Sequence, residues 1–108
     1  MFISDDQIQM AFDVLHSEAH AKSRAAYEYG SQRLKVVFAK AQLAASGKTV
    51  GERESLAMVS EEYQAALKQW HLICQTYFSE RDKREAASAV IEAFRTQAAD
   101  QRALGRVT

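Results

Sequence analysis

The feature that most constrains this chain is its lack of helix breakers. Proline is absent from its 108 residues, and glycine occurs only at Gly30, Gly47, Gly51 and Gly105. Because proline and glycine end helices and form the turns between strands, their scarcity excludes an all-β fold, which needs turns at regular spacing. The one strong interruption lies between residues 46 and 51. The sequence therefore predicts two long helices joined by a short loop.

The predicted helices cover residues 4–46 and 50–104, with a loop at 46–49 and a frayed tail at 105–108. Ser4 and Gln7 have the spacing of a capping box at the first helix start, and Thr49 and Glu52 offer a second one. Gly47 is interpreted as the residue that follows the end of the first helix. A charged stretch at 79–85 interrupts the apolar face of the second helix. This stretch is either a hinge between two helices or an exposed turn of one helix. The absence of glycine and proline there favours one continuous helix.

Apolar residues recur at steps of three and four along both segments, as on one face of a helix. Two such helices joined by a short loop pack as antiparallel neighbours. A turn centred near residues 48–49 predicts three facing pairs: Val59 with Phe38, Tyr63 with Leu34, and Trp70 with Tyr27. The predicted fold class is all-α, a long antiparallel helical hairpin that resembles a coiled coil and forms one domain over residues 1–108.

Two helices alone bury too little to enclose the aromatic residues of this chain. We therefore expect the hairpin either to bend back on itself or to pair with a second copy; a dimer with four packed helices is the simplest solution. The residues predicted to form the core and self-association seam are Phe12, Leu15, Tyr27, Leu34, Phe38, Val59, Tyr63, Trp70, Ile73, Tyr77, Ile91 and Phe94.

Lysine and arginine together number 14, as do aspartate and glutamate, so the formal net charge is zero. This balance argues against a binding footprint for DNA or an anionic membrane that covers the whole protein. The segment from about residue 94 is predicted to overhang the start of the first helix. Its Arg95, Arg102 and Arg106 are candidate contacts for nucleic-acid phosphates, and a solvated helix surface is the alternative interpretation.

No constellation of side chains indicates catalysis, and we expect no enzyme activity, cofactor or metal site. His16 and His20 are four residues apart, and His71 and Cys74 three, which are spacings that zinc ligands use on helices. The predicted register offsets the two pairs by several residues, so we expect them not to share one ion. Cys74 is the only cysteine, which excludes an intrachain disulfide and favours a reducing compartment.

No apolar run approaches the ~20 residues that a membrane span needs. The segment that starts at Met1 has neither the basic region nor the apolar core of a signal peptide. We therefore expect a cytoplasmic protein without membrane contact.

Several segments resemble small helical proteins encoded by tailed bacteriophages. They are Gly47, Thr49-Val50, Glu52-Arg53-Glu54, Ala57, Tyr63 and Phe94-Arg95-x-Gln97. The resemblance implies a phage-encoded protein of the host cytoplasm, from gene regions concerned with recombination and early functions. The leading hypothesis is a non-enzymatic protein that contacts an unidentified protein partner, as an accessory in DNA recombination or replication. The alternatives are nucleic-acid binding by the C-terminal arm, inhibition of a host defence complex, and a structural role in the virion.

Overall fold

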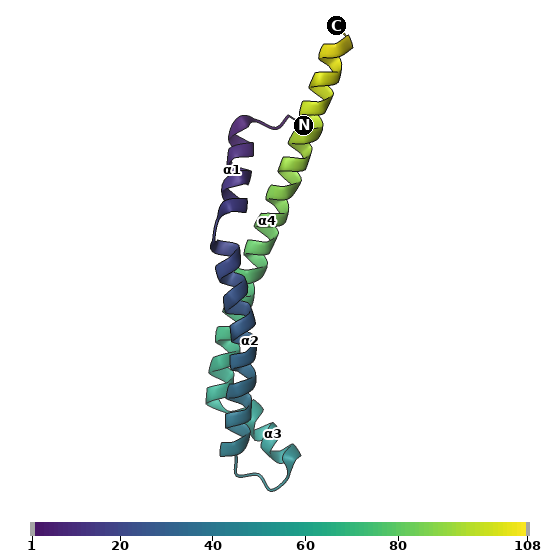
Figure 1. Cartoon of the computed structure of the whole chain (residues 1–108). Coiled ribbons are helices and arrows are strands. Elements are labelled where there is room, and N and C mark those ends of the chain that lie inside the picture. Colours follow the sequence, from purple (N-terminus) through teal and green to yellow (C-terminus); the bar gives the residue numbers. More distant parts are fainter. Residues whose placement is uncertain (1, 108) are drawn as a thin grey trace. The chain divides into compact units, whose positions relative to one another are not determined.

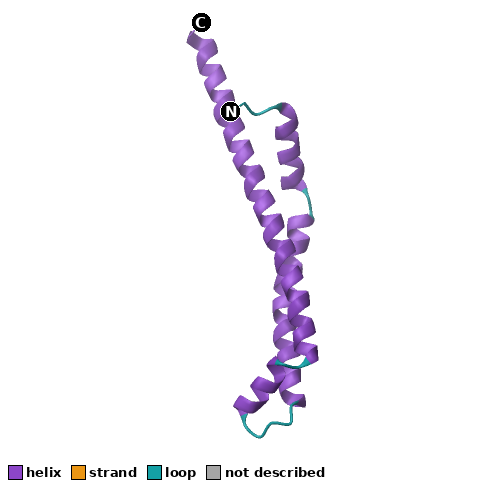
Figure 2. Ribbon diagram, turned by 180° about the vertical axis from the view of Figure 1, so that it is seen from behind, coloured by secondary structure: helices purple, strands orange, loops and turns teal. Residues whose placement is uncertain are grey.

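The computed structural model describes residues 2–107, and four helices account for most of them (Figure 1). They are α1 (Asp5–His16), α2 (Ala19–Ala44), α3 (Val50–Met58) and α4 (Glu61–Val107). No strand occurs among the described residues, and short loops connect the helices (Figure 2). The predicted fold class, an all-α helical hairpin, is confirmed.

Contacts group the residues into two compact units. The first unit combines α1 with the part of α4 that begins at Ser79, and the second combines α2 from Ala21 with α3 and with α4 up to Phe78. In the first unit Ile3 contacts Gln97 and Leu15 contacts Arg84, so the two helical segments run antiparallel. In the second unit Tyr27 contacts Tyr77 and Phe38 contacts Tyr63, again in antiparallel order.

The first predicted helix is divided into two. α1 ends at His16 and α2 begins at Ala19, whereas a single helix over 4–46 was expected. Ser17 causes the break, because its backbone is extended and its Oγ accepts a hydrogen bond of 3.1 Å from the amide of Ala19. A serine hydroxyl that satisfies a helix N-terminal amide in this way replaces a main-chain bond and starts a new helix.

The second predicted helix is divided too, at Val59–Ser60 and not at 79–85. The Oγ of Ser60 donates to the carbonyl of Ala57 at 2.7 Å and accepts from the amide of Tyr63 at 3.3 Å, so one hydroxyl closes α3 and caps α4. Residues 79–85 are helical throughout, with Lys83 paired to Glu80 at 3.3 Å.

The structure also differs from the prediction of a frayed tail at 105–108. α4 extends through Gly105 to Val107, and Thr108 lies outside the described residues.

The loop between α2 and α3 uses one predicted cap and one unexpected contact. Thr49 caps α3 as predicted, with its Oγ1 accepting from the amide of Glu52 at 3.1 Å; the Glu52 carboxylate then accepts from the amide of Lys48 at 2.8 Å. Gly47 does not end a helix, because α2 stops at Ala44 and no described glycine has a positive φ. Its role is close approach: a Cβ there would stand 2.8 Å from the Cβ of Glu52.

Small residues form the core of each unit. In the first unit Ala11, Ala87 and Ile91 are buried, with the partly buried Val14, Leu15 and Val90 packed against them. In the second unit the most buried residues are Ser23, Gly30 and Ala57. The helices thus approach closely, while the larger side chains line the edges of the contact.

Candidate interaction surfaces

An aromatic cluster occupies the end of the second unit that lies away from the loop between α2 and α3. The ring of Tyr27 lies 4.9 Å from that of Trp70 and stacks on Tyr77 at 4.5 Å, with Phe78 at 6.0 Å. The predicted pairing of Trp70 with Tyr27 is therefore confirmed. Gly30 lies under Trp70 so closely that an added Cβ would meet the ring at 3.0 Å. This glycine is what lets α2 approach the indole.

The register near the loop differs from the prediction by one helical turn. Phe38 packs on Tyr63, with 5.1 Å between ring centroids, and not on Val59. Val59 is 74% exposed, so it lies outside the seam to which it was assigned, and Tyr63 packs its ring on Phe38. The physical reason is α3: it takes up residues 50–58 in a separate helix and leaves Val59 at its C-terminal cap.

The remaining seam residues are distributed over both units. In the second unit every one of them is partly buried: Tyr27, Leu34, Phe38, Tyr63, Trp70, Ile73 and Tyr77. In the first unit Ile91 is buried, and Leu15 and Phe94 are partly buried. Phe12 is 40% exposed and contacts only the ring of His16 among the ring pairs of the described residues.

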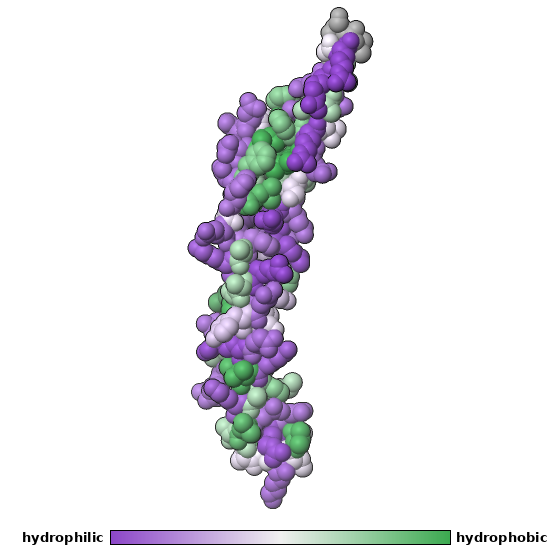
Figure 3. Space-filling model, in the orientation of Figure 1, coloured by the Kyte–Doolittle hydropathy of each residue, from purple (hydrophilic) through white to green (hydrophobic). Residues whose placement is uncertain are grey.

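Neither unit hides its large side chains completely. None of the large side chains described is fully buried, and the buried apolar residues are only Ile3, Ala11, Ala57, Ala87 and Ile91. Apolar patches consequently show between the charged groups on the surface in view (Figure 3). Five large apolar side chains that are exposed gather between residues 43 and 59: Leu43, Val50, Leu56, Met58 and Val59.

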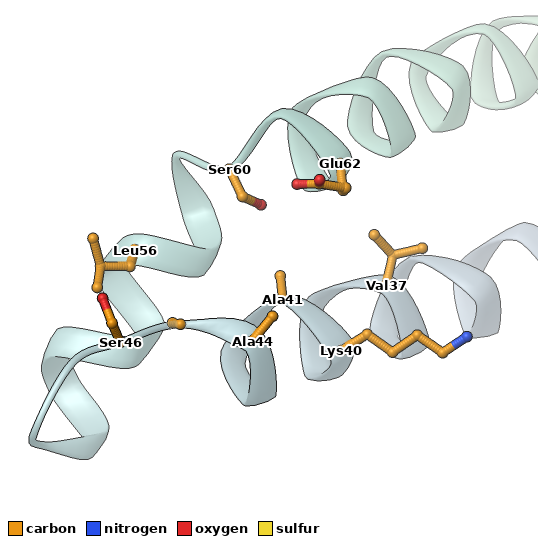
Figure 4. A pocket seen from close by; sticks show the side chains of 9 residues that line it. Val37, Lys40, Ala41, Ala44, Ser46, Leu56, Ser60 and Glu62 are labelled. Carbon is orange, nitrogen blue, oxygen red and sulfur yellow. The ribbon is translucent and has the colours of Figure 1, made fainter.

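An open groove of about 580 Å³ lies beside this apolar segment, where α2, α3 and the start of α4 meet (Figure 4). We call it the α3 groove. Its lining includes Val37, Ala41 and Ala44 of α2, Leu56 of α3, and Ser60 and Glu62 at the start of α4. Lys40 lines the α2 wall, opposite Glu62. Sequence analysis missed this groove, because it depends on the break at Ser60, which turns α3 away from the axis of α4.

The three candidate arginines of the C-terminal arm are all exposed. Arg95, Arg102 and Arg106 are seven and four residues apart, so they lie on one face of α4. The side chain of Gln97 forms two hydrogen bonds with the main chain of Ile3. Beyond Gln97, α4 continues past the level at which the described chain begins (Figure 1). The overhanging arm is therefore 98–107 and not 94–108.

The histidines and the cysteine are separated between the units. His16 and His20 belong to the first unit, and His71 and Cys74 to the second. Nδ1 of His16 is 2.8 Å from the carbonyl of Phe12 in its own helix. Among the described residues no group of three or more His, Cys, Asp or Glu side chains could hold a metal ion. Burial raises the pKa of the Cys74 thiol, which keeps it protonated and weakly nucleophilic near neutral pH.

Among the described helices, none combines the length and the apolar character that crossing a membrane requires.

No family model, curated protein or solved structure matches this chain. Its functional interpretation therefore depends on the apolar seam, the α3 groove and the arginines of the arm.

Proposed function

We propose that this chain is a non-enzymatic helical interaction protein that associates with itself to cover the apolar surface its own helices leave exposed. Each unit leaves large apolar side chains exposed: Met10 is 67% exposed in the first, and Leu43, Leu56 and Val59 are 87%, 44% and 74% exposed in the second. Large apolar side chains exposed close together mark surfaces that another protein covers.

The character of the exposed surface favours another helix as its partner. Small residues such as Ala41 and Ala44 border exposed aliphatic ones such as Leu43 and Leu56, and small side chains allow two helices to approach closely. A phage-encoded protein acting in DNA recombination or replication is the setting that we propose from the resemblance described above. Within it, the dimer would present its outer helical faces to a further protein.

The mass of the full chain in solution tests self-association directly. Sedimentation equilibrium between 1 and 100 μM, roughly the range in which dimers of standard interface size form, should give twice the 12.1 kDa of one chain at the upper concentrations. A mass of one chain throughout this range would contradict the proposal.

A second candidate function is nucleic-acid binding by the arm. The observation that favours it is the alignment of Arg95, Arg102 and Arg106 on one exposed face of α4. Each phosphate that an arginine neutralises adds about 0.9 to the slope of log affinity against log salt. Replacing all three with alanine should therefore lower that slope by up to about 3 in fluorescence anisotropy with labelled DNA.

A matched control replaces three exposed cations of α2 with alanine, namely Arg24, Arg33 and Lys35. This control should bind DNA as the unchanged chain does. Affinity that is absent at low salt, insensitive to salt, or lost equally in the control would reject nucleic-acid binding by the arm.

A further inference from the structure

We propose that the α3 groove is the site where a second copy of the chain docks. In this arrangement a two-fold axis sets Lys40 of each copy against Glu62 of the other. The inference rests on the self-association proposed above and assigns it to one surface. It is carried by three observations: the apolar character of the groove, the opposite charges on its two walls, and the weak attachment of α3.

The groove and the segment beside it carry several exposed apolar side chains. Leu56, inside the groove, is 44% exposed, and in the segment from 43 to 59 Leu43 is 87% and Val59 74% exposed. Apolar side chains in such numbers on a short segment mark a surface that is covered when the protein functions. A partner seated in the groove would remove Leu56 from water.

α3 gains little stabilisation from its own chain. Of its nine residues only Ala57 is buried, and its two ends depend on the hydroxyls of Thr49 and Ser60. A helix this short is not stable by itself in water, so its apolar side chains need a packing partner. The partner surface must be helical and lined with small residues to fit the width of the groove, as the Ala41 and Ala44 wall of a second copy is.

The charges of the groove favour a second copy over other occupants. Lys40 and Glu62 are both exposed, and among the described residues neither forms an ion pair. A groove for nucleic acid would be basic, whereas this one carries one charge of each sign. In a two-fold interface, residue i meets residue j of the partner and j meets i. One Lys40 and one Glu62 per copy therefore give two attractive pairs in the dimer.

Charge exchange tests this pairing without disturbing the apolar packing. Lys40→Glu alone would place two glutamates together at each contact, and Glu62→Lys alone two lysines. Each single variant should dimerise about tenfold more weakly than the unchanged chain. An equimolar mixture of the two variants should recover dimerisation as a mixed dimer, because both contacts become attractive again. The double variant should recover it as a homodimer.

Native mass spectrometry, with one variant labelled with ¹⁵N, distinguishes mixed dimers from homodimers. Sedimentation equilibrium gives the dissociation constants of the same samples. Lys35→Glu is the control, because Lys35 is exposed on α2 but does not line the groove. This variant should dimerise as the unchanged chain does.

A second pair of variants tests the apolar part of the groove. Leu56→Asp should abolish dimerisation at micromolar concentration, whereas Leu72→Asp, at a leucine of α4 that is 62% exposed and outside the groove, should not. Circular dichroism establishes whether each variant is helical. If Leu56→Asp does not fold, the charge exchange decides the matter alone.

The outcomes separate this inference from the proposed function. An unchanged chain that stays monomeric overturns both. An unchanged chain that dimerises, with groove variants of equal affinity, overturns docking at the groove and leaves self-association by another surface. Single variants that weaken dimerisation but do not recover on mixing overturn the two-fold pairing of Lys40 with Glu62.

Discussion

The side-chain amide of Gln97 holds both main-chain groups of Ile3. Its Oε1 accepts from the Ile3 amide at 2.7 Å and its Nε2 donates to the Ile3 carbonyl at 3.0 Å, across 94 positions of sequence. The Ile3 side chain is 5% exposed at the same place. Ile3 is thus fixed to α4 by two hydrogen bonds, which the side-chain amide can make because it carries both a donor and an acceptor.

Gln97→Ala should remove both bonds and leave the Ile3 groups partly buried without partners. We expect a loss of about 1–2 kcal/mol in the free energy of unfolding, measured by urea denaturation. Hydrogen exchange should quicken in α1 more than in α2. Gln101→Ala changes an exposed glutamine one turn further along and should have almost no effect. Equal effects of the two substitutions would mean that the amide contact contributes nothing to stability.

Gly30→Val should destabilise the second unit. Its Cβ would stand 3.0 Å from two ring carbons of Trp70 and 3.3 Å from Cδ1 of Ile73, and stacking against Tyr27 restrains the indole. Overpacking of this kind costs about 1–3 kcal/mol, which thermal unfolding would report as a lower Tm. Gly51→Ala is the matched substitution in open space and should stabilise α3 by roughly 0.5–1 kcal/mol. A valine at position 30 that raises the Tm would contradict the packing described.

Ser60→Ala should weaken the junction between α3 and α4. The hydroxyl that both closes α3 and caps α4 is lost, which costs about 1 kcal/mol at a typical N-cap. Ser79→Ala, in the interior of α4, should be neutral or slightly stabilising, because alanine is the better helix former there. Urea denaturation of both variants, together with the amide chemical shifts of residues 57–63, provides the measurement. Unchanged shifts and stability would show that the break does not depend on Ser60.

Titration of the Cys74 thiol should make the free energy of unfolding depend on pH only in the alkaline range. Burial raises the pKa of its thiol above the ordinary value of 9.0, so the unfolded chain loses this proton first as pH rises. The folded state binds the proton more tightly, and its stability therefore falls once the pH passes the unfolded pKa. Serine does not titrate, so the free energy of unfolding of the unchanged chain relative to Cys74→Ser should be constant from pH 6 to 8 and decrease above about pH 9. A relative stability that increases over that range would contradict this.

Local signals in the sequence predicted the fold class and two helix starts. Ser4 with Gln7 forms the predicted capping box, and Thr49 caps α3. The two breaks were missed because the prediction relied on glycine and proline as helix breakers. At Ser60 the sequence carries a signal for a helix start, because Glu61 and Glu62 follow it in the first turn of α4. Ser17 lies two residues before α2, whose first turn has no acidic residue.

The interaction surfaces were less predictable than the helices. Trp70 and Tyr27 could be paired although the register is shifted, because the ring of Tyr27 contacts both Trp70 and Tyr77, and a shift of one turn still leaves it beside the indole. Val59 could not be placed correctly, since its exposure depends on the direction in which α3 leaves Ser60. The α3 groove is formed by α2, α3 and the start of α4 together, so the spacing of apolar residues along any one helix does not predict it.

The attachment of Ile3 to Gln97 also determines how the last residues of α4 behave. The ten or so residues beyond Gln97 extend for roughly 15 Å and would not nucleate a helix by themselves. They are helical as a continuation of the turns before them, so they should unwind progressively from the C-terminus as the temperature rises. Backbone relaxation of Ala103 would then give a direct reading of whether anything binds there, because a ligand on the arm would slow its motion before it changed the mass or the stability of the whole protein.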